Sequence, residues 1–295
     1  MKPMFQGSIV ALVTPFRDGA VDEATLRELV EFQVANGTDG VVPCGTTGES
    51  PTLSHEEHRR VVGIVVEAAR GRLAVIAGTG SNSTREAIEL TQHAKATGAN
   101  GALLVNPYYN RPTQEGLYRH FRAVADAVDI PILVYNIVSR TAVNVETETL
   151  ARLARDCKNV VGVKEASGSL DQVTQVVLAC GPEFAVLSGD DNLTLPLMAV
   201  GGRGVISVIA NIVPKETAEL THAALDGDWK RARELHWKLY PLARAVFIET
   251  NPIPIKEAMA MAGMIAPEFR LPLCRMADAN RERLRAVLRQ YGLAK

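Results

Sequence analysis

Short runs of β-branched and apolar residues alternate along the chain with amphipathic, charge-bearing stretches. This alternation is typical of repeated βα units built on a parallel sheet. Eight strands within about 210 residues favour a (β/α)8 TIM barrel over an open, doubly wound sheet, which would leave surplus units. We predict the strands at residues 8–13, 40–44, 73–77, 101–105, 130–135, 160–164, 185–188 and 204–207.

Capping residues mark the predicted helices between these strands. Asp22, Ser54 and Thr113 each precede an amphipathic stretch, as N-cap residues do. After residue 208 the strand pattern stops, and helical patterns cover residues 214–225, 228–248, 254–263 and 277–290. We therefore predict a catalytic barrel over residues 1–224 and a carboxy-terminal helical domain over residues 225–295.

Composition narrows the function classes. The chain has 295 residues and balances 32 Lys and Arg against 33 Asp and Glu, so we expect no nucleic-acid or membrane partner and a small substrate. The four cysteines show no C-x-x-C spacing and are expected to be reduced. No signal peptide or membrane-length apolar run is visible, so we expect a cytoplasmic protein.

Lys164 ends the short apolar run of residues 160–163 and is the first candidate for chemistry. A free lysine amine has a pKa of about 10.4 and is a poor nucleophile at neutral pH. Burial among apolar residues lowers the pKa of an amine, and a desolvated lysine forms Schiff bases with carbonyl substrates. The alternative is a lysine that extends from a strand end into water.

Other polar residues follow the predicted strands and should meet Lys164, because a barrel collects the carboxyl ends of its strands on one rim. Thr46 and Thr47 stand between glycines, where hydroxyl and N–H groups suit a carboxylate. Tyr135 ends the strand before that of Lys164 and could move protons there, or could simply fill the barrel mouth. The histidines are scattered, and the 78–83 loop lacks the third glycine of a dinucleotide fingerprint, so we expect neither a metal nor a cofactor.

Five ordered motifs together resemble the dihydrodipicolinate synthase family, and the resemblance runs from about residue 7 to residue 272. The motifs lie at residues 45–49, 108–112, 135–141, 162–166 and 188–191, and residues 251–256 extend the match. The resemblance implies condensation of pyruvate with L-aspartate-4-semialdehyde, on the route to diaminopimelate and lysine. One departure is Val138, where many members have a proline that would restrict the loop before Arg140.

The resemblance also implies roles for individual residues. Lys164 would form the imine with pyruvate, and Tyr135 would act as general acid and base in a relay with Thr46 and Tyr109. In the family the residue matching Tyr109 comes from a neighbouring subunit, which implies a homotetramer made of two tight dimers. Positions that hold substrate match Thr47, Gly189 and Ile206 for pyruvate, and Arg140 for the semialdehyde carboxylate.

A second pocket is implied at the tight-dimer interface, where L-lysine inhibits some members. The matching residues are Ser50, Leu53, His55, His58, Asn82, Glu86 and Tyr108. Glu86 can pair with the ligand's ammonium group, and the histidines can complement its carboxylate. We hypothesise feedback inhibition by L-lysine.

Two rival readings remain open. N-acetylneuraminate lyases and 2-keto-3-deoxy-sugar-acid aldolases share the lysine and tyrosine, but they usually have serine at the first hydroxyl position and lack Arg140. A non-catalytic pyruvate-sensing barrel would keep the carboxylate loop and lose the proton relay, whereas Thr46, Tyr109 and Tyr135 are all present.

Overall fold

Eight parallel strands close into a barrel in the computed structural model, which describes residues 4–294. The first strand pairs with both the second and the last strand of the barrel, and this double pairing closes the sheet. All eight predicted strands are confirmed, with ends that shift by at most two residues. The strands are β1 (Gly7–Ala11), β4 (Gly40–Val42), β5 (Ala74–Gly78), β6 (Gly101–Val105), β7 (Ile132–Asn136), β8 (Val160–Glu165), β9 (Ala185–Ser188) and β10 (Gly204–Ser207).

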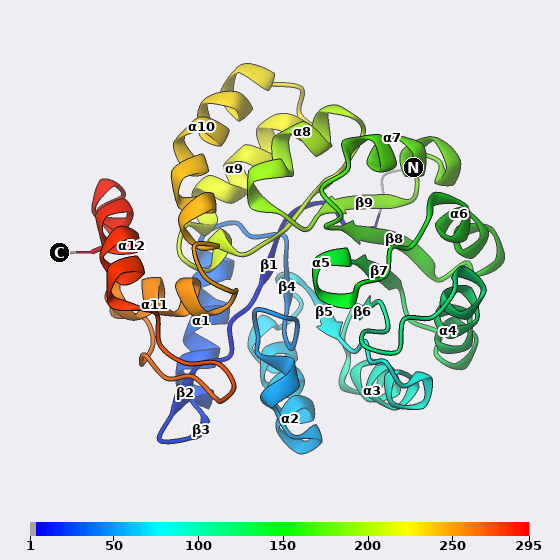
Figure 1. Cartoon of the computed structure of the whole chain (residues 1–295), viewed down its shortest axis with the longest axis horizontal. Helices are drawn as coiled ribbons and strands as arrows, with labels where there is room; N and C mark the ends of the chain where they lie inside the picture. Colours follow the sequence, from blue (N-terminus) through cyan, green and yellow to red (C-terminus); the bar gives the residue numbers. More distant parts are fainter. Residues whose placement is uncertain (1–3, 295) are drawn as a thin grey trace.

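A ring of helices surrounds the strands (Figure 1). The predicted N-caps are confirmed: the side chains of Asp22, Ser54 and Thr113 each accept a backbone N–H of the helix that follows, and Ser54 forms a capping box with Glu57. The helices of the ring are α1 (Glu23–Ala35), α2 (His55–Ala69), α3 (Thr84–Thr97), α4 (Gln114–Ala127), α6 (Thr147–Asp156), α7 (Leu170–Cys180), α8 (Thr194–Ala199) and α9 (Pro214–Leu225).

The sequence pattern missed helices α6 and α8 and a short hairpin, all of which have weak local signals. No side chain caps the start of α6, and α8 is only six residues long. A hairpin of β2 (Phe16–Arg17) and β3 (Ala20–Val21) turns at Asp18 and Gly19, which both adopt positive φ. Two-residue strands are too short to show an alternating pattern.

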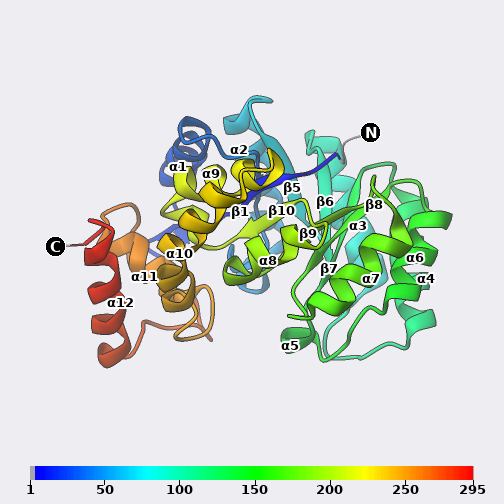
Figure 2. The same cartoon turned by 90° about the horizontal axis from the view of Figure 1, so that it is seen from above.

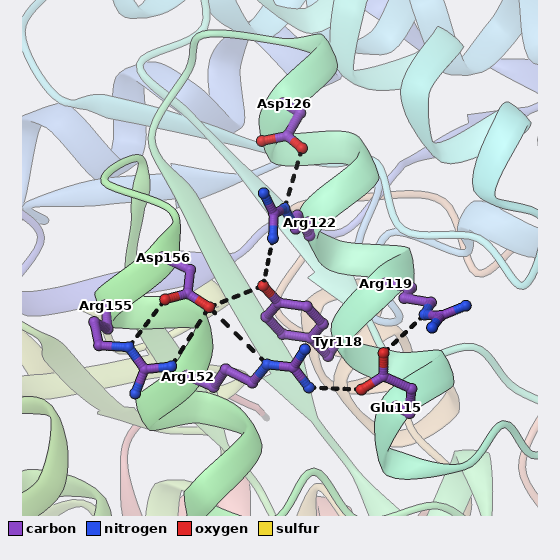
Figure 3. A network of polar contacts seen from close by, with 8 residues as sticks. All are labelled: Glu115, Tyr118, Arg119, Arg122, Asp126, Arg152, Arg155 and Asp156. Atoms are coloured by element: carbon purple, nitrogen blue, oxygen red, sulfur yellow. Dashed lines mark hydrogen bonds and ion pairs between the residues drawn. The ribbon is translucent and has the colours of Figure 1, made fainter.

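Side-chain pairing holds α6 against α4 (Figure 3). The Tyr118 hydroxyl donates to Asp156 at 2.9 Å, and the Arg152 guanidinium lies 3.4 Å from the centroid of the Tyr118 ring. Arg152 also donates to Glu115 at 2.6 Å. Such half-exposed pairs contribute little energy singly, but this network joins the two helices on either side of β7 and the loop that follows it.

The chain ends in three further helices, which confirm the predicted helical extension: α10 (Trp229–Ala245), α11 (Ile253–Met261) and α12 (Asp278–Gln290). Both views place α11 and α12 beside α10, at the end of the molecule away from α4 and α6 (Figures 1 and 2). Leu235, Ile255 and Leu284 of the extension share one apolar cluster with Val10 of β1 and Val65 of α2. No helix within residues 4–294 is long and apolar enough to cross a bilayer.

Apolar side chains fill the inside of the barrel. Ile9, Ile76, Leu133, Leu187 and Ile206, each from a different strand, belong to one buried cluster. Packing of this kind leaves no channel through the sheet, so a polar site has room only at the rim where the strands end.

Candidate active site

Lys164 and Tyr135 are direct neighbours at the carboxyl rim, because the register of β7 and β8 pairs them. The Lys164 amine lies 4.1 Å from the centroid of the Tyr135 ring. Lys164 is 5% exposed and Tyr135 is 6% exposed. The amine therefore lies in the barrel mouth against an aromatic face, whereas a lysine that extended into water would be far more exposed.

Gly189 allows the Lys164 side chain to pass close to the end of β9. A Cβ atom at position 189 would lie 2.5 Å from the Cβ of Ala166 and 3.2 Å from the Cε of Lys164. The next residue, Asp190, was given no role from the sequence. Burial raises the pKa of its carboxyl group, and the positive charge of Lys164 opposes that shift, which places an acidic group near the amine.

The loop after β4 presents the two predicted hydroxyl groups. Gly48 N–H donates to the Gly45 carbonyl at 3.1 Å, and Glu49 N–H donates to the Thr46 carbonyl at 3.2 Å, so the loop is a compact turn. Thr46 lines the cavity described below. Thr47 is buried, and its Oγ1 accepts a hydrogen bond from Asn251 at 3.0 Å.

Arg140 lies on α5 (Val138–Thr141), a single helical turn that follows β7. Its guanidinium donates to the Asn251 carbonyl at 2.9 Å. Val138 is the first residue of this turn, and its carbonyl accepts from Ala142 N–H at 2.8 Å. Asn251 thus contacts both Thr47 and Arg140, although the sequence marks it only as part of a motif and predicts no role for it.

A buried polar network secures the segment after α5. The Glu165 carboxylate, next to Lys164 in β8, accepts from Ser167 N–H at 2.7 Å and from Asn136 and Gln172. Asn136 in turn accepts from Val145 N–H at 3.0 Å. Burial raises the pKa of Glu165, and these hydrogen bonds oppose the shift. The network ties the strand that carries Lys164 to the loop that carries Arg140.

A cavity of about 420 Å³ opens at this rim, a size suited to a small organic molecule. Residues of both predicted sites line it: Thr46, Tyr135 and Arg140 were predicted for catalysis and substrate binding, and Ser50, Leu53, His55, His58, Glu86 and Tyr108 for L-lysine binding. Lys164, Thr47, Gly189, Ile206, Asn82 and Tyr109 are not among its lining residues. Ile206 lies deeper, in the apolar core of the barrel.

The Glu86 carboxylate, which the sequence predicts to bind a lysine ligand, already has polar partners. His55 lies 3.2 Å from one oxygen of Glu86, and the Ser81 hydroxyl donates to the other. His58 is buried with its Nε2 2.8 Å from the Gly78 carbonyl, and burial lowers the pKa of its ring. The Asn82 amide donates to the Tyr108 carbonyl at 3.1 Å, which joins the 78–83 loop to the loop after β6.

Tyr109 lies apart from the other predicted catalytic residues. It is 92% exposed and adopts a positive φ of 70°, a region that non-glycine residues rarely occupy. Its neighbour Asn110 donates to the Asn82 carbonyl at 2.9 Å, which secures the loop. The chain therefore presents this ring to the outside and not to its own cavity.

A closed (β/α)8 barrel with a buried lysine on the sixth strand, a tyrosine beside it and a hydroxyl-bearing loop nearby defines an enzyme of the class I aldolase type, a lyase that works through a Schiff base. The chain belongs to the dihydrodipicolinate synthetase family, whose profile matches residues 4–291.

Individual relatives match over almost their full length. A 4-hydroxy-tetrahydrodipicolinate synthase from Syntrophus aciditrophicus is 59% identical over 98% of this chain and 99% of its own. The dihydrodipicolinate synthase structure from Aquifex aeolicus superposes with a TM-score of 0.97 at 56% identity, covering 98% of this chain and 99% of that one. The lysine-bound enzyme from Cyanidioschyzon merolae gives a TM-score of 0.96 at 41% identity, covering 99% of this chain and all of the other.

Adding a single methyl group at position 189 tests the close packing around Lys164. We expect Gly189→Ala to lower the free energy of unfolding by about 1–3 kcal/mol, because the new Cβ overlaps Ala166 and crowds Lys164. Gly63→Ala is the matched control, since a Cβ there meets only an ordinary contact at 3.9 Å from Thr97. Denaturant unfolding of both variants measures the difference, and equal stability of the two would contradict the crowding.

Proposed function

We propose that this chain condenses pyruvate with L-aspartate-4-semialdehyde, the activity of a 4-hydroxy-tetrahydrodipicolinate synthase. The observation that carries the proposal is the buried Lys164 amine against Tyr135, at a rim where Asn251 brings Thr47 and Arg140 together. The names of full-length relatives at close to 60% identity support the same reaction.

The reaction begins when the Lys164 amine attacks the ketone of pyruvate and water leaves, giving an imine. The protonated imine withdraws electrons from the adjacent methyl group, so a proton leaves carbon 3 and an enamine forms. The enamine carbon then attacks the aldehyde of the second substrate, whose oxygen takes up a proton. The amine of that substrate then attacks the re-formed imine carbon, which closes the ring and releases the Lys164 amine. Tyr135 moves protons in these steps, in a relay with Thr46 and with Tyr109 of a second copy of the chain.

The binding roles are those that the matching family positions imply, and the chemistry of Thr47 and Arg140 fits them. Thr47 and the backbone at Gly189 and Ile206 hold pyruvate, with the Thr47 hydroxyl directed to the carboxylate. Arg140 provides a planar, permanently charged group suited to the carboxylate of the semialdehyde, which a lysine would match less well.

Borohydride trapping tests the imine. Pyruvate with reductant is expected to leave a stable covalent adduct on the peptide that contains Lys164, detected by mass spectrometry. Lys164→Ala should give no adduct, while the exposed Lys158→Ala serves as a control that keeps it. An intact Lys164 that forms no adduct, or an adduct that survives Lys164→Ala, would refute the mechanism.

Assays with different acceptor aldehydes distinguish the synthase from the rival enzymes that form the same imine. Carbon–carbon bond formation with aspartate semialdehyde, but not with N-acetylmannosamine or glyceraldehyde, supports the synthase. Turnover with the sugar aldehydes alone would favour the lyases. Pyruvate binding without an adduct or turnover would favour a sensor.

We also propose that the chain works as a homotetramer of two tight dimers, in which Tyr109 completes the relay of its partner. The support is the exposed ring of Tyr109, held in an unfavourable backbone conformation at the edge of the cavity-lining loop.

Mixed assemblies test this arrangement. Tyr109→Phe and Lys164→Ala are each expected to be inactive alone, and mixing them should restore part of the activity, because some sites then combine an intact Tyr109 with an intact Lys164. Arg85→Ala, which removes an exposed ion pair with Glu89, is a control that should behave as wild type. Lack of restoration in assemblies shown to be mixed, or sedimentation as a fully active monomer, would contradict the shared site.

Inhibition by L-lysine is a second proposal for the same cavity. Glu86 accepts the ligand's ammonium group, and His55, His58 and Tyr108 line the same space, which also contains the catalytic Tyr135. A lysine-bound relative with the same fold supports this assignment.

Calorimetric titration tests it directly. Wild-type protein is expected to bind L-lysine at or below millimolar concentration and to lose condensation activity on binding. Glu86→Gln should weaken binding at least tenfold because the charged partner is gone, whereas Glu89→Gln, on the same helix but paired with Arg85, should bind normally. Heat changes no larger than dilution for the wild type at millimolar lysine would sink the proposal.

A further inference from the structure

Glu49 and Lys256 form an ion pair that is completely buried between the barrel and the carboxy-terminal extension. Glu49 belongs to the loop after β4, and Lys256 lies on α11. The Lys256 amine also lies 4.3 Å from the centroid of the Phe16 ring and 5.2 Å from that of Phe269. Two residues about 200 positions apart in the chain thus meet where water does not reach.

Stability alone is a poor reason for such a pair. Removing two charges from water costs free energy that their attraction roughly repays, and apolar side chains of similar volume often do as well. Burial lowers the pKa of Lys256, and the Glu49 carboxylate opposes that shift. The cost of removing the amine from water is thus opposed by its attraction to the carboxylate. A fully buried pair is directional, however, and it fixes the two backbones that carry it.

The backbone that carries Glu49 is the turn of Thr46 and Thr47. Glu49 adopts a left-handed φ of 53°, and its N–H donates to the Thr46 carbonyl at 3.2 Å. A shift of the Glu49 side chain would therefore be transmitted to Thr46 through this short turn. The second Glu49 oxygen accepts from Arg270 N–H at 3.4 Å, so the extension holds both ends of the carboxylate.

The same stretch of the extension reaches the rim at a second place. Asn251, five residues before Lys256, donates to the Thr47 hydroxyl at 3.0 Å and accepts from Arg140 at 2.9 Å. Residues 251–256 therefore hold the 45–50 loop at Thr47 and at Glu49. A loop held at two points keeps its hydroxyl groups in one place when the substrate binds.

We propose that Glu49 and Lys256 are positioning residues, and that their buried pair lets the carboxy-terminal extension set the place of Thr46 and Thr47 at the pyruvate end of the site. The inference rests on the proposed function, because that function assigns the Thr47 hydroxyl to pyruvate and the neighbouring Thr46 hydroxyl to the proton relay. The pair touches no substrate and acts through the loop alone.

Steady-state kinetics of Lys256→Met tests the proposal. In a ping-pong reaction, kcat/KM for each substrate reports its own half-reaction. We expect kcat/KM for pyruvate to fall about 10- to 100-fold, with a matching loss in the rate of borohydride trapping. The fold decrease in kcat/KM for the semialdehyde should be at least three times smaller than that for pyruvate, since Arg140 keeps its contact with Asn251. A smaller active fraction would lower both values in equal proportion.

Glu257→Gln is the matched control. Glu257 is the next residue of α11 and is equally buried, but it pairs with Arg275 and Arg281 of the extension and not with the loop. It should lower the melting temperature and leave the ratio of the two kcat/KM values unchanged.

The double variant Glu49→Gln/Lys256→Met keeps the test decisive where the single variant fails to fold. It leaves no unpaired buried charge, so it should recover stability while pyruvate kcat/KM stays at least tenfold low. Wild-type values for pyruvate in either folded variant, or equal losses for both substrates, would overturn the positioning role. A wild-type chain without imine or condensation would refute the proposed function instead, so the two failures are distinguishable.

Discussion

Pairing of β1 with both β4 and β10 closes the sheet, and the arrangement of the site depends on that closure. A closed parallel barrel turns all its strand ends to one rim and fills its interior with apolar side chains. Residues as distant in the chain as Thr46 and Gly189 thereby come to the same opening. Lys164 becomes buried there because the layer below it is packed and Tyr135 lies beside it.

Closure by itself leaves the loops on the rim free, and buried polar contacts restrain them. The Glu165 network fixes the segment after Arg140 from below, through Asn136 and Val145. The extension restrains the opposite loop through Asn251 and Lys256. Each of these groups is buried and hydrogen-bonded, so moving a loop would leave polar atoms without partners at a cost in free energy.

The cavity brings two kinds of chemistry into one space. Tyr135 and Arg140 line it together with Glu86, His55 and the exposed Tyr108. A molecule held by Glu86 would occupy part of the volume that continues to Tyr135. Because the volume is shared, a ligand bound at Glu86 and His55 has a physical route to affect proton transfer by Tyr135.

Local signals in the sequence determined the eight strands, the capped helices and the candidacy of Lys164, because periodicity, N-caps and an amine after an apolar run depend on neighbouring residues. Those signals failed for α6, α8 and the β2–β3 hairpin, which are uncapped or very short. Tertiary structure alone decided the contacts of Asn251 with Thr47 and Arg140 and the pairing of Glu49 with Lys256. These contacts join residues that lie about 110 to 207 positions apart, and no local pattern encodes which distant groups barrel closure and helix packing will bring together.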